Sequence, residues 1–220
     1  SFFQPTSDHQ NNGGKFIGRF GKKASALDLQ HQTVNAYNQD IGITSSFNLY
    51  DTYTGLEINP EISNQTIHDV VFYLRTLKAP IQRNPSHQEI IQGKEVFMEM
   101  GCAKCHIPEY TTPTSDISAL SNKTFYPYTD LLLHDMGSGL DDGYTEGTAR
   151  TFEWRTPPLW GLGLAPNSQG GQFFLLHDGR ARAIEEAIEM HGGEAIASRN
   201  QYLQLETTDR DALIKFLKSL

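Results

Sequence analysis

Apolar residues recur at helical spacing at the carboxyl end of the chain. The stripe that they form consists of Leu213, Phe216, Leu217 and Leu220. This i, i+3, i+4, i+7 pattern is typical of a helix that buries one face. The polar segment from Thr208 to Asp211 is predicted to cap it, since hydroxyl and carboxylate side chains satisfy the first N–H groups of a helix.

A second helix is predicted to run through about Met100. Ser86 and Glu89 stand at the spacing of a capping box, and Gly101 follows the last turn as a terminator. One side of this helix carries Ile90, Gly93 and Phe97. Because Gly93 has no side chain, another helix can cross closely at that point. Ordinary amphipathic packing is the alternative explanation.

The segment 66–80 repeats the spacing of the closing helix. Its apolar positions are Val70, Tyr73, Leu74 and Leu77, and Pro80 stops it. If each such helix closes a similar unit, residues 1–80 are the end of a preceding unit plus a connecting segment, and the chain is a fragment. Coincidence between two amphipathic helices is the alternative.

A further helix is predicted from Ala181 to His191. Its apolar side is formed by Ile184, Ala187, Ile188 and His191. This spacing puts the imidazole on the buried stripe, where it needs a partner. The pair Gly192-Gly193 then ends the helix, so a histidine that stabilises a helix C-terminus is the alternative.

Between residues 107 and 170 the periodicity is lost. The chain is therefore predicted to be mainly α with long loops. Irregular stretches of this length are unusual in a compact domain unless a cofactor supplies apolar mass for the core.

Composition and charge exclude some classes of partner. The formal net charge is −8, with 18 Lys and Arg against 26 Asp and Glu, and the basic residues are scattered. A nucleic-acid partner is not expected, because phosphate backbones are bound by clustered cations. No apolar run approaches the roughly 18 residues of a membrane span. An acidic surface suits a basic redox partner, or serves solubility alone.

The two cysteines stand in the segment Cys102-Ala103-Lys104-Cys105-His106. A thioredoxin-like pair would require a βαβ context, and a zinc site would require two more ligands at short spacing. Covalent haem attachment requires two thiols for the vinyl groups and a following histidine for the iron. The segment supplies all three, which predicts one covalent haem c per chain in a cytochrome c-like haem domain with long loops.

Four motifs after this segment stand in a recognisable order. They are Tyr128–Gly137, Glu153–Gly161, Leu176–Ala181 and His191–Ala195. Together they resemble the di-haem oxidoreductases formerly labelled thiol oxidoreductases, and more distantly the second haem domain of bacterial di-haem cytochrome c peroxidases. Gly18–Lys23 and Asp40–Thr44 resemble the stretch that links the two haem domains of that family.

The resemblance implies that residues 81–220 are a second haem domain, with periplasmic or other extracytoplasmic location. The family carries two haem motifs and this chain carries one. In such enzymes the first haem has the open site and the second relays electrons. The expected partner is therefore a second haem domain upstream or a small redox protein.

The distal axial ligand has several candidates in the sequence. His191 is preferred, because it falls where the related peroxidases place the axial methionine of their second haem. Met136 in a Met-Gly turn is the next candidate, while His134 and His177 are less favoured. A second imidazole would give a lower potential than a methionine.

Other residues are predicted to line the haem. His177 and Arg180 are expected to hold a propionate, because Arg pairs with carboxylates in two-point geometry. Trp154 and Trp160 are expected to wall the pocket. The alternatives are a loop turn at Asp178-Gly179 and aromatic residues that clamp the surface. Calcium is a further option through four aspartates, Asp130, Asp135, Asp141 and Asp142.

Two function classes follow from the sequence. The first is an electron-relay domain of a di-haem oxidoreductase. The alternative is an enzyme with peroxidase or oxygen chemistry at this haem itself. A haem-free zinc or thiol protein is the third interpretation, kept as a check.

Overall fold

The structure is a computed structural model that describes residues 11–12 and 15–220. The chain divides into two compact units, Ser1–Lys78 and Ala79–Leu220. The part of the predicted preceding unit that comprises residues 1–10 and 13–14 lies outside the described residues. No helix in the described ranges is both long and apolar enough to cross a membrane.

The first unit contains two α-helices that pack against each other, α1 and α2. Its elements are β1 (Asn11–Asn12), β2 (Lys15–Phe16), α1 (Leu29–Asn35), a π-helical turn (Ala36–Asp40) and α2 (Asn64–Thr76). The side chain of Asp28 caps α1 by accepting a hydrogen bond from the N–H of His31 at 2.8 Å. Ser63 caps α2 in the same way.

The predicted helix at 66–80 exists as α2, but it is shorter and its stripe is not buried. It ends at Thr76, because Leu77 adopts an extended backbone. Ile67 is its buried residue, whereas Tyr73 and Leu77 are 61% and 53% exposed. The sequence therefore identified the helix correctly but chose the wrong face as the buried one.

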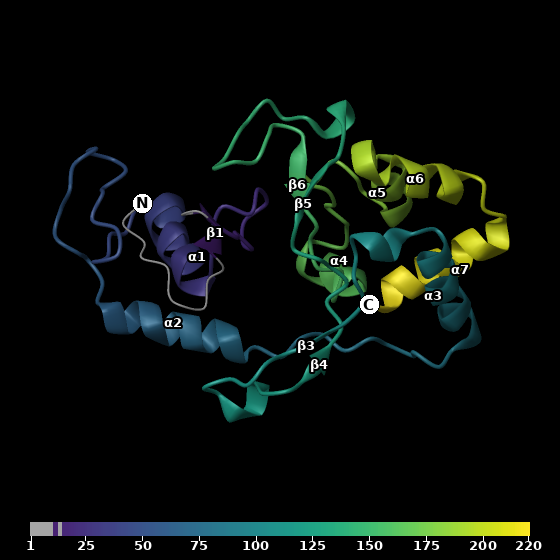
Figure 1. The fold of residues 1–220 in the computed structure, drawn as a ribbon, viewed down its shortest axis with the longest axis horizontal. Coiled ribbons are helices and arrows are strands. Elements are labelled where there is room, and N and C mark those ends of the chain that lie inside the picture. Colours follow the sequence, from purple (N-terminus) through teal and green to yellow (C-terminus); the bar gives the residue numbers. More distant parts are fainter. Residues whose placement is uncertain (1–10, 13–14) are drawn as a thin grey trace. The chain divides into compact units, whose positions relative to one another are not determined.

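The second unit is built on two crossed helices, α3 (Gln88–Glu99) and α7 (Thr207–Ser219), which Figure 1 shows side by side. They cross at Gly93, where an added Cβ would lie 2.0 Å from the carbonyl oxygen of Ala212. The predicted close crossing is therefore confirmed. Phe97 and Phe216 meet beside it, with ring centroids 5.4 Å apart, and the core of the unit surrounds them.

The predicted stripe of the closing helix is buried as expected, with Leu213, Phe216, Leu217 and Leu220 at most 5% exposed. The predicted caps are wrong. The N-cap residue is Glu206 in α7 and His87 in α3. Neither side chain makes a capping hydrogen bond. The N-cap of α3 is His87 instead of Ser86, and the carboxylate of Glu89 pairs with Lys215 of α7.

The remaining elements of the second unit are short, and long loops connect them. The strands pair as β3 with β4 and as β5 with β6. The elements are β3 (Tyr110–Thr111), β4 (Thr124–Phe125), β5 (Leu133–Asp135), β6 (Glu153–Arg155), α4 (Ala165–Ser168), α5 (Ile184–Glu189) and α6 (Ile196–Leu203). Single 3₁₀ turns lie at Cys102–Lys104, Ser118–Leu120, Ser138–Leu140, Leu162–Leu164 and Gly193–Ala195. The fold is mainly helical, as predicted.

Helix α5 is shorter than the predicted helix 181–191. Ala181 instead bridges Leu175, and Ala183 is extended, so the helix begins at Ile184. His191 follows the C-cap residue Met190 and donates its backbone N–H to the carbonyl of Ile188. The imidazole therefore stands at the helix end instead of within its last turn.

Candidate haem site

The Cys-x-x-Cys-His segment begins where α3 ends. Gly101 adopts a left-handed backbone with φ of 76°, a conformation that favours glycine, and the chain then enters a 3₁₀ turn. The N–H of His106 donates to the carbonyl of Cys102 at 3.0 Å, which closes the segment on itself. Helix α3 thus presents both sulfurs and the imidazole at one end of the crossed-helix core.

His106 is half-buried, and its orientation is fixed by the main chain. Its Nδ1 atom donates to the carbonyl oxygen of Tyr128 at 3.0 Å. Tyr128 has a positive φ of 54°, a strained conformation for a residue with a side chain, and this directs its carbonyl toward the imidazole. Burial lowers the pKa of His106 to about 4. The imidazole is therefore neutral, and Nε2 keeps the lone pair that a metal ligand requires.

The two thiols are protonated at neutral pH. Burial raises the pKa of Cys102 to about 11, and burial together with nearby carboxylates raises the pKa of Cys105. Reactive thiols and zinc ligands act as thiolates, and their pKa values are lowered. The environment of this pair therefore disfavours the interpretation as a reactive thiol pair.

A second half-buried imidazole, that of His191, lies near His106. The charge interaction with His191 is one of the causes that lower the pKa of His106. Its Nδ1 atom donates to the carbonyl oxygen of Ala187 at 2.6 Å, and burial lowers its own pKa. Both histidines thus hold Nδ1 against a main-chain carbonyl and are neutral, which leaves Nε2 of each as a base.

The turn after His191 packs directly on the end of β5. An added Cβ on Gly192 would lie 2.7 Å from the carbonyl oxygen of Met136, and one on Gly193 would lie 2.1 Å from that of Asp135. Gly193 also has a positive φ of 50°. The pair Gly192-Gly193 is therefore required for close approach to β5, as well as for ending a helix.

Gly193→Ala is expected to destabilise the second unit more than its backbone conformation alone explains. Gly147 has a similar φ of 60° and open space around it, so Gly147→Ala carries the strain without the clash. We expect a loss of about 1 kcal/mol for Gly147→Ala and about 3 kcal/mol for Gly193→Ala. Urea unfolding of the two variants checks this, and equal losses would contradict the close packing.

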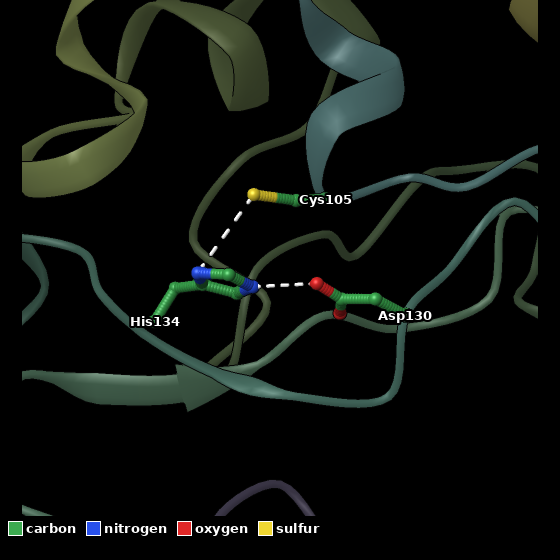
Figure 2. A group of neighbouring side chains, drawn as sticks. All are labelled: Cys105, Asp130 and His134. Atoms are coloured by element: carbon green, nitrogen blue, oxygen red, sulfur yellow. Dashed lines mark hydrogen bonds and ion pairs between the residues drawn. The ribbon is translucent and has the colours of Figure 1, made fainter.

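His134 lies beside the Cys-x-x-Cys-His segment, and both of its ring nitrogens contact carboxylates. Its Nε2 lies 2.8 Å from Asp130 Oδ2 and its Nδ1 lies 2.8 Å from Glu194 Oε2. Figure 2 shows the imidazole between Asp130 and the sulfur of Cys105, which is 3.8 Å from Nδ1. Among the described residues, Cys105, Asp130 and His134 are the one group with three potential metal ligands close together. Both nitrogens of His134 thus have carboxylate partners, which favours His191 and Met136 over His134 as the predicted distal ligand.

Met136 lies at the same edge of the site. It is half-buried, and its N–H donates to the carbonyl of Phe152 at 3.0 Å. Its own carbonyl faces Gly192, directly after His191. The structure therefore brings both candidate distal ligands to one region, and the choice between them stays a prediction.

Three of the four other predicted haem contacts lie close together: Trp154 on β6, and His177 and Arg180 on the loop before α5. The indole of Trp154 stacks on the His177 ring, with centroids 3.7 Å apart and planes 9° apart. Trp154 Nε1 donates to the carbonyl of Leu140 at 2.7 Å, and Arg180 donates to that of Gly139 at 2.9 Å.

Arg180 also pairs with a carboxylate of the protein, since its Nε lies 2.6 Å from Asp178 Oδ2. The role of His177 and Arg180 toward a propionate stays a prediction. Trp160 contacts Phe125, with ring centroids 6.0 Å apart, and its role as a wall of the haem pocket stays a prediction.

The four aspartates proposed for calcium do not converge within the part of the chain that the structure describes. Each accepts a hydrogen bond from the N–H of a residue two positions further along the chain; the acceptors are Asp130, Asp135, Asp141 and Asp142. Asp130 is further engaged by His134. These bonds are those of ordinary Asx turns.

Two features of the site carried no signal in the sequence. The carbonyl of Tyr128 is a main-chain group, and its use depends on a backbone conformation that no residue type there demands. Glu194 meets His134 from 60 positions away. Neither contact has a local spacing that sequence patterns reveal.

A mainly helical fold, a Cys-x-x-Cys-His segment and two neutral, half-buried imidazoles are features of haem-binding redox proteins. Comparison with protein families agrees: residues 12–220 match the family described as "Di-haem oxidoreductase, putative peroxidase". The chain belongs to this di-haem oxidoreductase family, and haem is the cofactor that the family implies.

Comparison with individual proteins adds little. No curated protein matches the sequence. Among solved structures, hydrazine synthase from Kuenenia stuttgartiensis, studied under xenon pressure, is similar with a TM-score of 0.47 and 16% identity. The match covers 88% of this chain and 62% of that one. The chain thus spans less than two thirds of the length of that structure.

Proposed function

We propose that the second unit is a cytochrome c-like domain that transfers electrons through one covalently bound haem with two histidine ligands. Cys102 and Cys105 would form the thioether links, and His106 and His191 would bind the iron from its two sides. The bound haem supplies a one-electron couple, which a bis-histidine environment places at low potential.

One observation supports this proposal most strongly. Both half-buried imidazoles donate Nδ1–H to a main-chain carbonyl, at 3.0 Å for His106 and 2.6 Å for His191. Metal-bound histidines use this arrangement because it fixes the tautomer and strengthens Nε2 as a donor. Two such histidines would fill both axial positions, which excludes peroxide and favours electron transfer over catalysis.

The proposed setting is extracytoplasmic. Covalent haem attachment in bacteria takes place outside the cytoplasm, so a periplasmic location is expected. The partner is a second haem domain upstream or a small redox protein. The net charge of −8 would favour association with a basic surface of that partner.

The experiment that tests this function is absorption spectroscopy of the chain produced with cytochrome maturation factors. The ferric and reduced proteins should be low-spin and should not bind carbon monoxide. His191→Ala should keep the covalent haem but become high-spin and bind carbon monoxide, because one axial position is then open.

Met136→Leu is the matched control, since leucine keeps the volume but cannot bind iron. It should leave the spectrum unchanged. If Met136→Leu opens the iron and His191→Ala does not, methionine is the ligand. If the unsubstituted chain binds carbon monoxide, the relay function is wrong and peroxidase or oxygen chemistry at this haem is favoured.

A further inference from the structure

His134 joins two segments that are far apart in the sequence. Its two nitrogens face carboxylate oxygens at 2.8 Å, Asp130 on one side and Glu194 on the other. Ionised carboxylates only accept hydrogen bonds, so this geometry requires both ring nitrogens to carry protons. The result is a pair of charge-assisted bonds, which are about twice as strong as neutral ones.

One of these bonds leads to the segment that holds His106. Asp130 follows Tyr128, whose carbonyl accepts the proton of His106 Nδ1. Thr129 lies between Tyr128 and Asp130. Its buried hydroxyl donates to the carbonyl of Thr156 at 2.7 Å, and its backbone N–H donates to the carbonyl of Ile107. Asp130 thus belongs to the hydrogen-bonded segment that also orients His106.

The other bond leads to the segment that carries His191. Glu194 follows His191 by three residues, and its second oxygen accepts the N–H of Asp135 at 3.1 Å. Glu194 therefore holds the turn after His191 onto β5 through two bonds. Its side chain is 57% exposed, so little besides these bonds keeps it in place.

The environment of His134 agrees with a charged imidazole. Burial lowers the pKa of His134, but the hydrogen bonds to Glu194 and Asp130 outweigh burial and raise its pKa above the ordinary value. The bond to His134 is the main cause that lowers the pKa of Glu194. Cys105, with Sγ 3.8 Å from Nδ1, places this ion-paired group directly beside the haem attachment segment (Figure 2).

We propose that His134 is a positioning residue that keeps the distal side of the haem closed, by tying the His191 segment to the segment that orients His106. The inference rests on the proposed bis-histidine function, and it adds the residue that keeps the second histidine ligand in place. With haem bound, the bonds of His134 to Asp130 and Glu194 would keep His191 in position to bind the iron. Where these bonds are broken, the turn after His191 is freer to move from β5, and the site opens to small ligands.

The test compares carbon monoxide binding by the reduced, haem-loaded full chain and three variants. His134→Gln removes one of the two charge-assisted bonds and the positive charge. Glu194→Gln keeps an acceptor for Asp135 but removes the negative charge. The control variant is Lys215→Gln. It removes the exposed ion pair between Lys215 and Glu89, which joins α3 and α7.

We expect His134→Gln to increase the carbon monoxide-bound fraction at subsaturating gas on the order of tenfold, since hydrogen bonds to charged groups bias such equilibria by about that factor. Glu194→Gln should give a smaller increase in the same direction. Lys215→Gln should match the unsubstituted chain. A high-spin component in the ferric spectrum should follow the same order, which a loss of stability alone would not produce.

The inference is overturned if His134→Gln carries haem normally and remains as closed as the unsubstituted chain. If His134→Gln takes up no haem, the Glu194→Gln variant is the deciding measurement. The inference is then overturned if Glu194→Gln also takes up no haem, or if it stays low-spin and binds no more carbon monoxide than the unsubstituted chain. Failure of the proposed function is distinguished by the unsubstituted chain, which would then bind carbon monoxide by itself.

Discussion

Replacing both cysteines, in the variant Cys102→Ser/Cys105→Ser, is expected to abolish covalent haem completely. Serine is close to cysteine in size, but its hydroxyl does not form a thioether with a vinyl group. The two residues are the only cysteines of the chain, so no other thiol can substitute. Haem staining of a denaturing gel, where only covalent haem remains with the protein, measures the effect.

The same variant should also lose order in the second unit. Between α3 and α5 the chain is mostly loop, and its strands have two or three residues each. Without a bound cofactor these loops bury little apolar surface to offset their conformational entropy. Amide hydrogen exchange should therefore accelerate there and less in α3 and α7.

His191→Ala is the matched control for attachment, because it leaves both thiols in place and should keep the haem on a denaturing gel. Haem that remains bound to Cys102→Ser/Cys105→Ser under these conditions would contradict thioether attachment. Normal exchange protection in the haem-free variant would contradict the structural role of the cofactor.

The second large effect is expected at the helix crossing. On an exposed helix surface, Gly→Ala stabilises a protein by about 1 kcal/mol, since alanine is the better helix former. At Gly93 the added Cβ would lie 2.0 Å from the carbonyl oxygen of Ala212 and 2.7 Å from Phe216 Cβ. We therefore expect Gly93→Ala to reverse the sign and destabilise the second unit by about 3 kcal/mol.

Gly139→Ala provides the comparison, because nothing lies within 4 Å of a Cβ there. It should change the free energy of unfolding by less than about 0.5 kcal/mol. Urea unfolding of the haem-loaded proteins, followed by far-UV circular dichroism, measures both. A stabilised Gly93→Ala would show that α3 and α7 do not cross as closely as the structure has them.

The elements that the sequence predicted best are those whose pattern is local and dense. The stripe of α7 and the glycine of α3 record which faces are buried, because burial demands apolar or small residues at a 3.6-residue period. The predicted apolar positions Tyr73, Leu74 and Leu77 in or next to α2 are exposed, so this apolar face is not covered as that of α7 is. Apolar spacing alone does not reveal what covers a helix.

The caps of α3 and α7 show a second limit. Ser86 and Glu89 have the spacing of a capping box, but Glu89 pairs with Lys215, which is 126 positions away. A side chain that can reach a distant cation is not restricted to its own helix end. Local capping patterns are therefore overridden wherever the tertiary fold offers a charged partner.

The sequence by itself predicted a haem protein, and the match to the di-haem oxidoreductase family agrees with that prediction. Cys102, Cys105 and His106 are contiguous, so their spacing is sufficient to indicate haem attachment, and the helices on either side follow from periodicity. The tertiary structure alone decided how the imidazoles are held. The carbonyl of Tyr128, the turn of Gly192-Gly193 on β5 and the bond between His134 and Glu194 join residues that are distant along the chain. Such contacts depend on backbone direction and on packing between segments, and residue type and spacing encode neither.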